Sequence, residues 1–125
     1  MSRVRGRDTV PEKTVRSAIH RMGYRFRLHV CTLPGNPDIV LPRHRRVVFV
    51  HGCFWHGHKG CPRGQRPTSR TEFWDAKLQG NIDRDVKNLR ALRHLDWKPL
   101  VIWECQTKNP AQLRLKLRQV FPESN

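Results

Sequence analysis

The first helical pattern in the chain follows a capping signal at residues 9–12. The string Thr-Val-Pro-Glu places a hydroxyl before the helix, a proline in its first turn and a glutamate that can reach back, which together form a capping box. Gly23 suits a left-handed helix end. Between these signals, apolar side chains recur at helical spacing at Val15, Ala18, Ile19 and Met22. The pattern predicts a helix that covers a sheet.

Strand patterns follow this helix. Residues 24–30 alternate apolar and polar side chains, which indicates a strand with one face in solvent. The turn string Pro-Gly-Asn-Pro at 34–37 ends that pattern. Residues 38–41 and 46–50 predict two short strands around a basic hairpin tip at 42–45. The second of them is apolar enough to lie in the middle of a sheet.

The second half of the chain returns to helical spacing. A helical pattern resumes near Thr71 and continues after Gly80, a buried strand covers 98–104, and Pro110 begins a terminal helix. This order predicts an α/β fold, a mixed sheet flanked by helices, in a single domain over residues 1–125. Because no segment resembles a signal peptide or a bilayer span, we expect a soluble intracellular protein without a membrane partner.

Charge narrows the class of partner. The chain has 25 Lys and Arg against 10 Asp and Glu, a formal net charge of +15. Such an excess favours a polyanionic partner, nucleic acid first and an anionic membrane surface second.

The segment from about 51 to 70 is rich in Gly and Pro and nearly free of aliphatic residues, so a metal ion is a candidate source of its order. Three near ligands and one distant ligand are typical of a tetrahedral structural Zn²⁺ site. Unligated thiols and an exposed histidine are the alternative. Cys31 lies on a strand pattern and is expected to be a small buried side chain. The candidate ligands are Cys53, His58, Cys61 and Cys105.

Asp38 begins one strand of the predicted hairpin, opposite the end of its partner strand at His51. A Mg²⁺-dependent phosphodiesterase can hold its metal at such a place, with His51 and His56 available for phosphate contact and proton transfer. Taken alone, a turn aspartate that accepts a backbone hydrogen bond is the favoured interpretation of Asp38.

Two further patterns have a functional and a structural interpretation. Lys77, Asn81 and Asp85 recur every four residues, so they either face a cleft, where Asp85 could orient a histidine, or form a solvated face with Asn81 as an N-cap. The consecutive aromatic pairs at 54–55 and 73–74 suggest stacking on bases or wedging between them. Alternatively one member of each pair packs on the sheet, which we expect of Phe73.

Three longer motifs carry a family resemblance: Leu-Pro-Gly-Asn-Pro-Asp at 33–38, Val-Phe-Val-His-Gly-Cys-Phe-Trp-His at 48–56 and Arg-Thr-Glu-Phe-Trp at 70–74. In these, and in Trp-Glu-Cys at 103–105, the chain resembles the very-short-patch-repair endonucleases over nearly its whole length. The resemblance implies a restriction-endonuclease-like fold and Mg²⁺-dependent nicking of duplex DNA 5′ to the thymine of a T·G mismatch. Such mismatches arise when 5-methylcytosine deaminates. The resemblance also favours a metal-binding role for Asp38 over a turn role.

The same resemblance implies roles for individual residues. The Mg²⁺ ligands would be Asp38 and the main-chain carbonyl of Val50. The other catalytic groups would be His51 at the scissile phosphate, His56 as a general base held by Asp85, and Glu12 on metal-linked water. The structural Zn²⁺ would be held by Cys53, His58, Cys61 and Cys105. Contacts to DNA would come from a major-groove wedge of Phe54, Trp55 and Trp74, together with Lys77, Asn81 and Arg84.

Three features depart from the family pattern. The wider restriction-like fold usually carries an acid-x-Lys pair where this chain has Phe49 and His51, so one carboxylate must anchor the metal. The zinc-loop spacing is longer than expected, which makes His56 an alternative to His58 as a ligand. Family members carry an N-terminal minor-groove arm, and Met1 stands at its inserted residue, so either the true start lies upstream or the arm is absent.

The expected partner is duplex DNA with a T·G mismatch, and mismatch-repair proteins are further candidates. We expect a monomer at the nucleoid in the bacterial cytoplasm. A zinc-stapled DNA-binding module without catalysis and a basic RNA-binding protein are the alternative functions.

Overall fold

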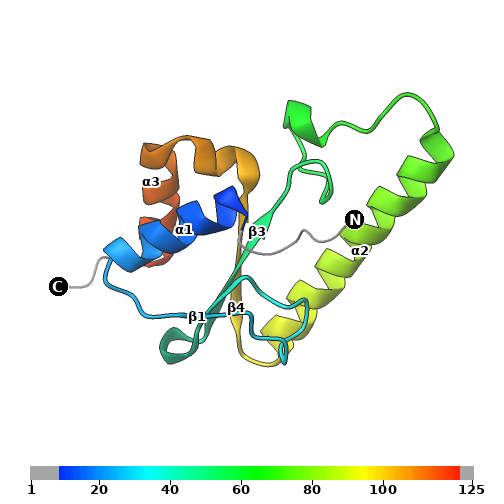
Figure 1. Ribbon diagram of the computed structural model, residues 1–125. Coiled ribbons are helices and arrows are strands. Elements are labelled where there is room, and N and C mark those ends of the chain that lie inside the picture. Colours follow the sequence, from blue (N-terminus) through cyan, green and yellow to red (C-terminus); the bar gives the residue numbers. More distant parts are fainter. Residues whose placement is uncertain (1–8, 122–125) are drawn as a thin grey trace.

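The computed structural model describes residues 9–121, which form a four-stranded sheet with helices on both faces (Figure 1). The helices are α1 (Val10–Arg21), α2 (Thr71–His94) and α3 (Pro110–Val120). The strands are β1 (Arg27–Leu28), β2 (Ile39–Leu41), β3 (Arg46–His51) and β4 (Lys98–Trp103). Short 3₁₀ helices lie at Pro42–His44, Pro62–Gly64 and Glu104–Lys108. The predicted mixed α/β fold is confirmed, whereas the N-terminal arm lies outside the described residues.

The sheet combines an antiparallel meander with one parallel pair. Its strand order is β1-β2-β3-β4, with β1–β2 and β2–β3 antiparallel and β3–β4 parallel. The parallel pair is joined by the loop after β3 and by α2, as a parallel connection requires. In the β3–β4 register His51 lies opposite Trp103, so the two strands end together.

Two apolar layers hold the helices to the sheet. α1 and α3 lie on one face and α2 on the other (Figure 1). On the α1/α3 face, buried Val15, Ile19 and Leu117 pack with Leu41 and Ile102. The opposite layer is smaller and is made by Val40, Val47, Phe49 and Leu92. α2 is therefore anchored to the sheet through its C-terminal half.

The capping box predicted for α1 is present. The Thr9 hydroxyl accepts from the Glu12 N–H at 3.3 Å, and Glu12 Oε2 accepts from the Thr9 N–H at 2.9 Å. Gly23 follows the helix with a φ of 92°, which is the left-handed stop expected from the sequence. The cap thus fixes a buried carboxylate, Glu12, in the first turn of the helix.

The strand predicted over 24–30 is wrong in its length. Its partner β2 lies between Pro37 and Pro42, so the ladder has only the pairs Arg27↔Val40 and Leu28↔Ile39. The chain then leaves the strand at His29, whose φ is 57°. Cys31 lies beyond this point and is exposed, so the expected buried side chain is also wrong.

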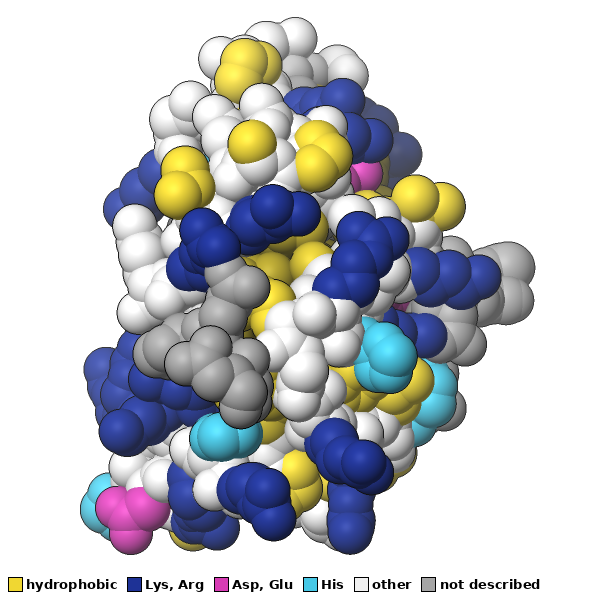
Figure 2. Space-filling model, turned by 90° about the vertical axis from the view of Figure 1, so that its left-hand side faces the viewer, with side chains coloured by type: hydrophobic (Ala, Val, Ile, Leu, Met, Phe, Trp, Pro, Cys, Tyr) yellow, Lys and Arg dark blue, Asp and Glu magenta, His cyan; other side chains and the backbone are white. Residues whose placement is uncertain are grey.

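The second helix is continuous through Gly80. α2 begins at Thr71 and ends at His94, so the interpretation of Asn81 as an N-cap is wrong. None of the helices within residues 9–121 has both the length and the apolar composition needed to cross a membrane. Many basic side chains and few acidic ones lie on the face of the molecule formed by α1 and α3 (Figure 2).

Candidate active site and metal centre

The common end of β3 and β4 brings two loop segments together. Cys53 follows β3 by two residues, and Cys105 follows β4 by two residues. Because neighbouring parallel strands end at the same sheet edge, these segments meet there. Two clusters of potential ligands form at this edge.

The first cluster contains the four predicted zinc ligands. One ligand atom each from Cys53, His58, Cys61 and Cys105 lie within 4.8 Å of one another, and Cys105 Sγ is 3.5 Å from His58 Nδ1. Ligand atoms of a tetrahedral zinc site are about 3.3 to 3.8 Å apart, given the usual Zn–S and Zn–N bonds. The residues therefore fit a zinc ion, and this arrangement favours a metal site over scattered thiols.

The histidine of this cluster is His58, not His56. The His58 ring stacks on Trp103 with centroids 4.2 Å apart and planes 7° apart, which holds Nδ1 toward the thiols. Burial raises the pKa of the Cys53 thiol to about 11, so the metal-free thiol stays protonated at neutral pH. A bound metal ion would reverse this, because it deprotonates a coordinating thiol.

Asp38 stands where the β2–β3 ladder ends. Its N–H donates to the Val48 carbonyl at 3.0 Å, and its Oδ2 accepts from the Val50 N–H at 2.7 Å. Because the N–H and C=O of one strand residue face the same neighbouring strand, the Val50 carbonyl faces this same edge. The hairpin thus places a carboxylate beside a main-chain oxygen.

A second carboxyl group lies against Asp38. Glu12, only 4% exposed, is held by the capping box of α1 within hydrogen-bonding reach of Asp38. Burial first, and then the Glu12 carboxylate, raise the pKa of Asp38 to about 7, although the Val50 N–H and Arg16 act in the opposite direction. Two acidic groups in a partly buried contact are a donor set that suits a hard divalent cation.

The second cluster contains His51, His56 and Asp85. The two imidazoles stack with centroids 3.9 Å apart, and His56 Nδ1 lies 2.6 Å from Asp85 Oδ2. If the carboxylate accepts from Nδ1–H, the Nε2 atom of His56 is left free to accept a proton. Burial, followed by His56, lowers the pKa of His51 to about 4, so His51 is neutral at physiological pH.

A single cavity joins these groups. A hollow of about 210 Å³ is lined by Asp38, Val50, His51, His56 and Asp85. A second hollow of about 250 Å³ is also lined by Asp38, together with Glu12. The sequence-predicted catalytic residues are therefore assembled around Asp38.

Two further residues of this cavity were missed by sequence analysis. Asn36 and Asn88 line the hollow together with Asp38. Asn88 lies three residues after Asp85, on the same helix face, so helical spacing could have identified it. Gly35, with a φ of +78°, approaches α2 so closely that a Cβ there would lie 3.1 Å from Asn88. The absence of a side chain at Gly35 therefore lets the loop pack closely against α2 at this wall of the cavity.

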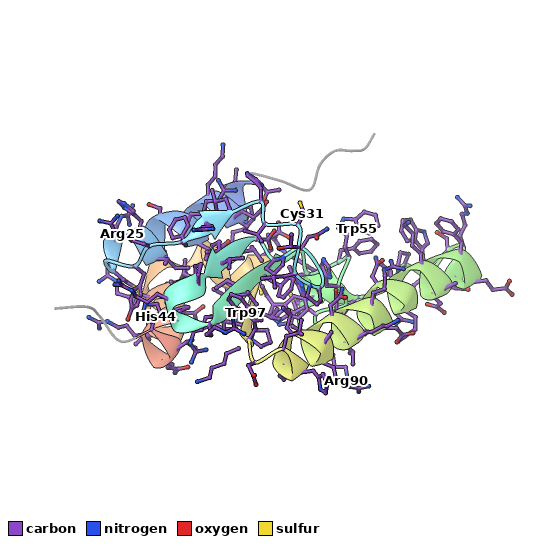
Figure 3. The ribbon with its side chains drawn as sticks, turned by 90° about the horizontal axis from the view of Figure 1, so that it is seen from below. Arg25, Cys31, His44, Trp55, Arg90 and Trp97 are labelled. Carbon is purple, nitrogen blue, oxygen red and sulfur yellow. The ribbon has the colours of Figure 1, made fainter. Side chains whose placement is uncertain are left out.

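Four aromatic rings form a cluster between the loop after β3 and the start of α2. Phe54 lies 5.0 Å from Trp55 and 5.4 Å from Trp74, measured between ring centroids. Phe73 lies 5.1 Å from Trp74 and is 48% exposed, so the expectation that it packs on the sheet is wrong. Trp55 is 47% exposed and projects from the molecule beside α2 (Figure 3). Aromatic surface that is open to solvent is available here for stacking.

The polar stripe of α2 starts next to these rings. Lys77 and Arg84 are exposed, and the amide of Asn81 donates to the Trp55 carbonyl at 3.1 Å. Arg84 in turn donates to the Asn81 side-chain oxygen. The stripe therefore contacts the aromatic segment at Asn81 and the histidine cluster at Asp85.

Comparison with known proteins identifies relatives of this chain. The family model of the DNA mismatch endonuclease Vsr matches residues 1–63. The "Type II nicking enzyme V.XorIIP" of Xanthomonas oryzae is 48% identical over 99% of this chain and 90% of its own length. The "DNA mismatch endonuclease Vsr" of Escherichia coli is 40% identical over 90% of this chain and 72% of its own length. A nicking enzyme of Neisseria meningitidis, "V.NmeAIP", is 41% identical over 98% of this chain and 87% of its own.

Proposed function

This chain belongs to the Vsr family of DNA mismatch endonucleases, and from that premise we propose that it nicks duplex DNA 5′ to the thymine of a T·G mismatch in a Mg²⁺-dependent hydrolysis. The family and its nicking relatives are hydrolases that nick DNA, and this activity follows from membership of the family. The choice of mismatch and of metal is the proposal. We further propose that it acts as a monomer on the bacterial chromosome, because a single asymmetric lesion needs one active site, and that mismatch-repair proteins are further partners.

The divalent ion would be held by Asp38 and the Val50 carbonyl, with Glu12 binding through water. Such an ion polarises the scissile phosphate and lowers the pKa of bound water. The contact between the Asp38 and Glu12 carboxyl groups supports this assignment, because two carboxyl groups held together offer the oxygen ligands that a hard divalent cation prefers.

The histidines would handle the proton and the phosphate. With Asp85 holding Nδ1 of His56, the free Nε2 would accept a proton from the attacking water as a general base. His51 is neutral because burial lowers its pKa, and its ring N–H would donate to an oxygen of the scissile phosphate. The two rings stack with centroids 3.9 Å apart, which supports the proposal that His51 and His56 act on the same phosphate.

The aromatic cluster would recognise the lesion. Phe54, Trp55 and Trp74 would enter the duplex from the major groove, which is easiest where base pairing is already weak. Lys77, Asn81 and Arg84 would lie near the DNA on the exposed side of α2, and the net charge of +15 would supply phosphate attraction.

Zinc would order the segment that carries these groups. Cys53 and His58 bracket Phe54, Trp55 and His56 in the chain, so two of the four ligands would fix both ends of the segment that holds wedge and base. Four protein ligands leave no open position, which assigns the zinc a structural role.

The observation that carries the proposal is the single cavity where Asp38 lies with His51, His56 and Asp85. The test uses T·G and fully paired duplexes with both strands labelled, Mg²⁺ or EDTA, and the Asp38→Ala variant. We expect a nick in the thymine strand only, lost with EDTA and with Asp38→Ala, while the variant still folds and binds DNA. A wild-type protein that binds T·G duplex without nicking it would identify a non-catalytic module, and a preference for structured RNA would favour an RNA-binding protein.

A further inference from the structure

Lys116 of α3 contacts the segment that follows β4, where Cys105 lies. Its ammonium group donates to the Gln106 side-chain oxygen at 2.9 Å, and the same oxygen accepts from the Trp103 N–H at 2.9 Å. Gln106 follows Cys105 directly in the chain. The two arginines of α3 are exposed, whereas Lys116 is half-buried. The helix therefore holds one ammonium group beside the residue that follows a candidate zinc ligand.

The charge of Lys116 acts on two of the four candidate ligands. Burial first, and then the Lys116 charge, lower the pKa of His58. Burial also lowers the pKa of Lys116, whereas Cys105 acts on it in the opposite direction. Because His58 Nδ1 and Cys105 Sγ lie 3.5 Å apart, one cation interacts electrostatically with both ligands of this pair.

Zinc bound at this cluster would leave a charge to be neutralised. Three thiolates and a neutral imidazole around Zn²⁺ carry one net negative charge, and a partly buried charge is costly unless it is paired. Arg63, which belongs to the loop itself, already lies 3.8 Å from the Glu104 carboxylate. Lys116 is held by the uncharged side chain of Gln106, so its full positive charge is available to the cluster.

We propose that Lys116 neutralises the zinc-bound cluster on the side of Cys105 and His58, and that it thereby raises the affinity of the cluster for zinc. The inference rests on the proposed zinc site and is independent of the nicking chemistry. Groups that contact metal ligands without binding the metal commonly change metal affinity by about 10- to 100-fold. In the metal-free protein burial disfavours the same charge, so its benefit is expected in the zinc-bound form.

The direct test compares Lys116→Met, which keeps an unbranched apolar stem and removes the charge, with Lys116→Arg, which keeps the charge. Arg114→Met is the matched control, because Arg114 is exposed on the same helix and its loss removes the same charge. The Kd for zinc is measured for each protein without DNA, by competition with a chromogenic chelator under reducing conditions.

We expect the zinc Kd of Lys116→Met to rise about 10- to 100-fold above that of Arg114→Met, and that of Lys116→Arg to stay close to the wild-type value. Equal Kd values for Lys116→Met and Arg114→Met would overturn the inference. Equal losses for Lys116→Met and Lys116→Arg would also overturn it, because packing at this position, and not charge, would then set the affinity.

Thermal unfolding of metal-free and zinc-bound protein separates this role from a structural one. At one fixed concentration of free zinc, Lys116→Met should lower the zinc-bound Tm relative to Arg114→Met and leave the metal-free Tm close to that of the control. If Lys116 only supported the fold through Gln106, both Tm values would fall equally, and the inference would be overturned.

The wild-type protein separates this inference from the proposed activity. Protein that nicks T·G duplex but binds no zinc would refute the zinc site and, with it, the role of Lys116. Protein that binds zinc and shows the expected loss in Lys116→Met, but does not nick T·G duplex, would support the role of Lys116 and refute the proposed activity alone.

Discussion

The sheet with α1 and α3 is ordered by apolar burial, whereas the loop after β3 and the first turns of α2 are not. All three residues of β2 are buried, and so are four of the six in β3. Between Gly52 and Lys77, by contrast, only Cys53 is buried. That region is held by ligand atoms, stacked rings and a few polar bonds.

The candidate site lies at the boundary between these two regions. Asp38 and His51 belong to the sheet, and His56 and Asp85 belong to the region around the loop. The geometry of the site therefore depends on two sources of stability that can be removed separately. The apolar half positions the Asp38 carboxylate, while the half that contains the Cys/His cluster brings His56 and the aromatic rings to it.

Removal of a proposed zinc ligand should give the largest effect, and a local one. Cys61→Ser changes a half-buried residue outside the sheet, so the sheet should keep its order while residues 52–66 lose theirs. Displacing catalytic groups by about 1 Å can cost roughly 100-fold in rate, so nicking should fall at least that far. Zinc content, nicking rate and hydrogen exchange of the two regions check this together.

The outcome that contradicts this prediction is full activity in zinc-free protein. Cys31→Ser is the matched control, because Cys31 is exposed and lies outside the ligand cluster. It should leave zinc content unchanged.

Truncation of the apolar half should lower the stability of the whole domain instead. Leu117 on α3 is fully buried, and Leu117→Ala should lower the free energy of unfolding by about 2 to 5 kcal/mol. Leu115 on the same helix is 61% exposed, so Leu115→Ala should change it by less than about 0.5 kcal/mol. Urea unfolding followed by circular dichroism measures both. A small loss for Leu117→Ala would remove the contrast between the two halves.

Local signals predicted the apolar half well, because its elements are specified by nearby residues. The capping box of α1 and the hairpin around Pro42–His44 follow from contacts within a few positions. The length of β1 does not, because it depends on the prolines that bound its partner strand. Cys31 is exposed for the same reason, because β1 ends before it.

The site was predictable in its residue types and less so in its geometry. Cysteine and histidine spacing pointed to the ligand cluster, and the structure brings those four residues together. Helical spacing from Asp85 could have placed Asn88 in the cavity, but the exposure of Phe73 depends on how α2 lies across the sheet, which periodicity alone does not determine. The contact of Asn81 with a backbone carbonyl has no sequence signal at all.

Without metal, the free energy of unfolding should depend on pH through Asp38, which lies at the boundary between the two regions. Burial raises the pKa of Asp38 from 3.8 to about 7, so between these values the folded state holds a proton that the unfolded state releases. Stability from this group is therefore fully present below about pH 4 and is lost as pH rises to about 7. His51 acts oppositely, because its pKa is lowered from 6.5 to about 4 and stability from it rises with pH in that window.

Comparison with Asp38→Asn isolates the carboxylate, because both proteins contain His51. In EDTA, the Tm of the wild type minus that of Asp38→Asn should decrease as pH rises from about 4 to about 7. Mg²⁺ at neutral pH should restore part of the wild-type Tm and none of the variant's. A difference in Tm that does not vary with pH would show that Asp38 is not perturbed by its surroundings.

The smallest effect should come from the surface ion pair of the half that contains the Cys/His cluster. Arg66 lies 3.3 Å from Asp75 and also bonds Gln79, and it connects the loop to α2 on the solvent side. Exposed pairs contribute about 0 to 1 kcal/mol, so Arg66→Ala should change the free energy of unfolding by no more than that. Nicking should be unchanged, because the proposed zinc ligands and the α2 contacts at 53–58 remain. If Arg66→Ala instead disordered the loop as Cys61→Ser does, surface charge rather than metal ligation would order this half of the molecule.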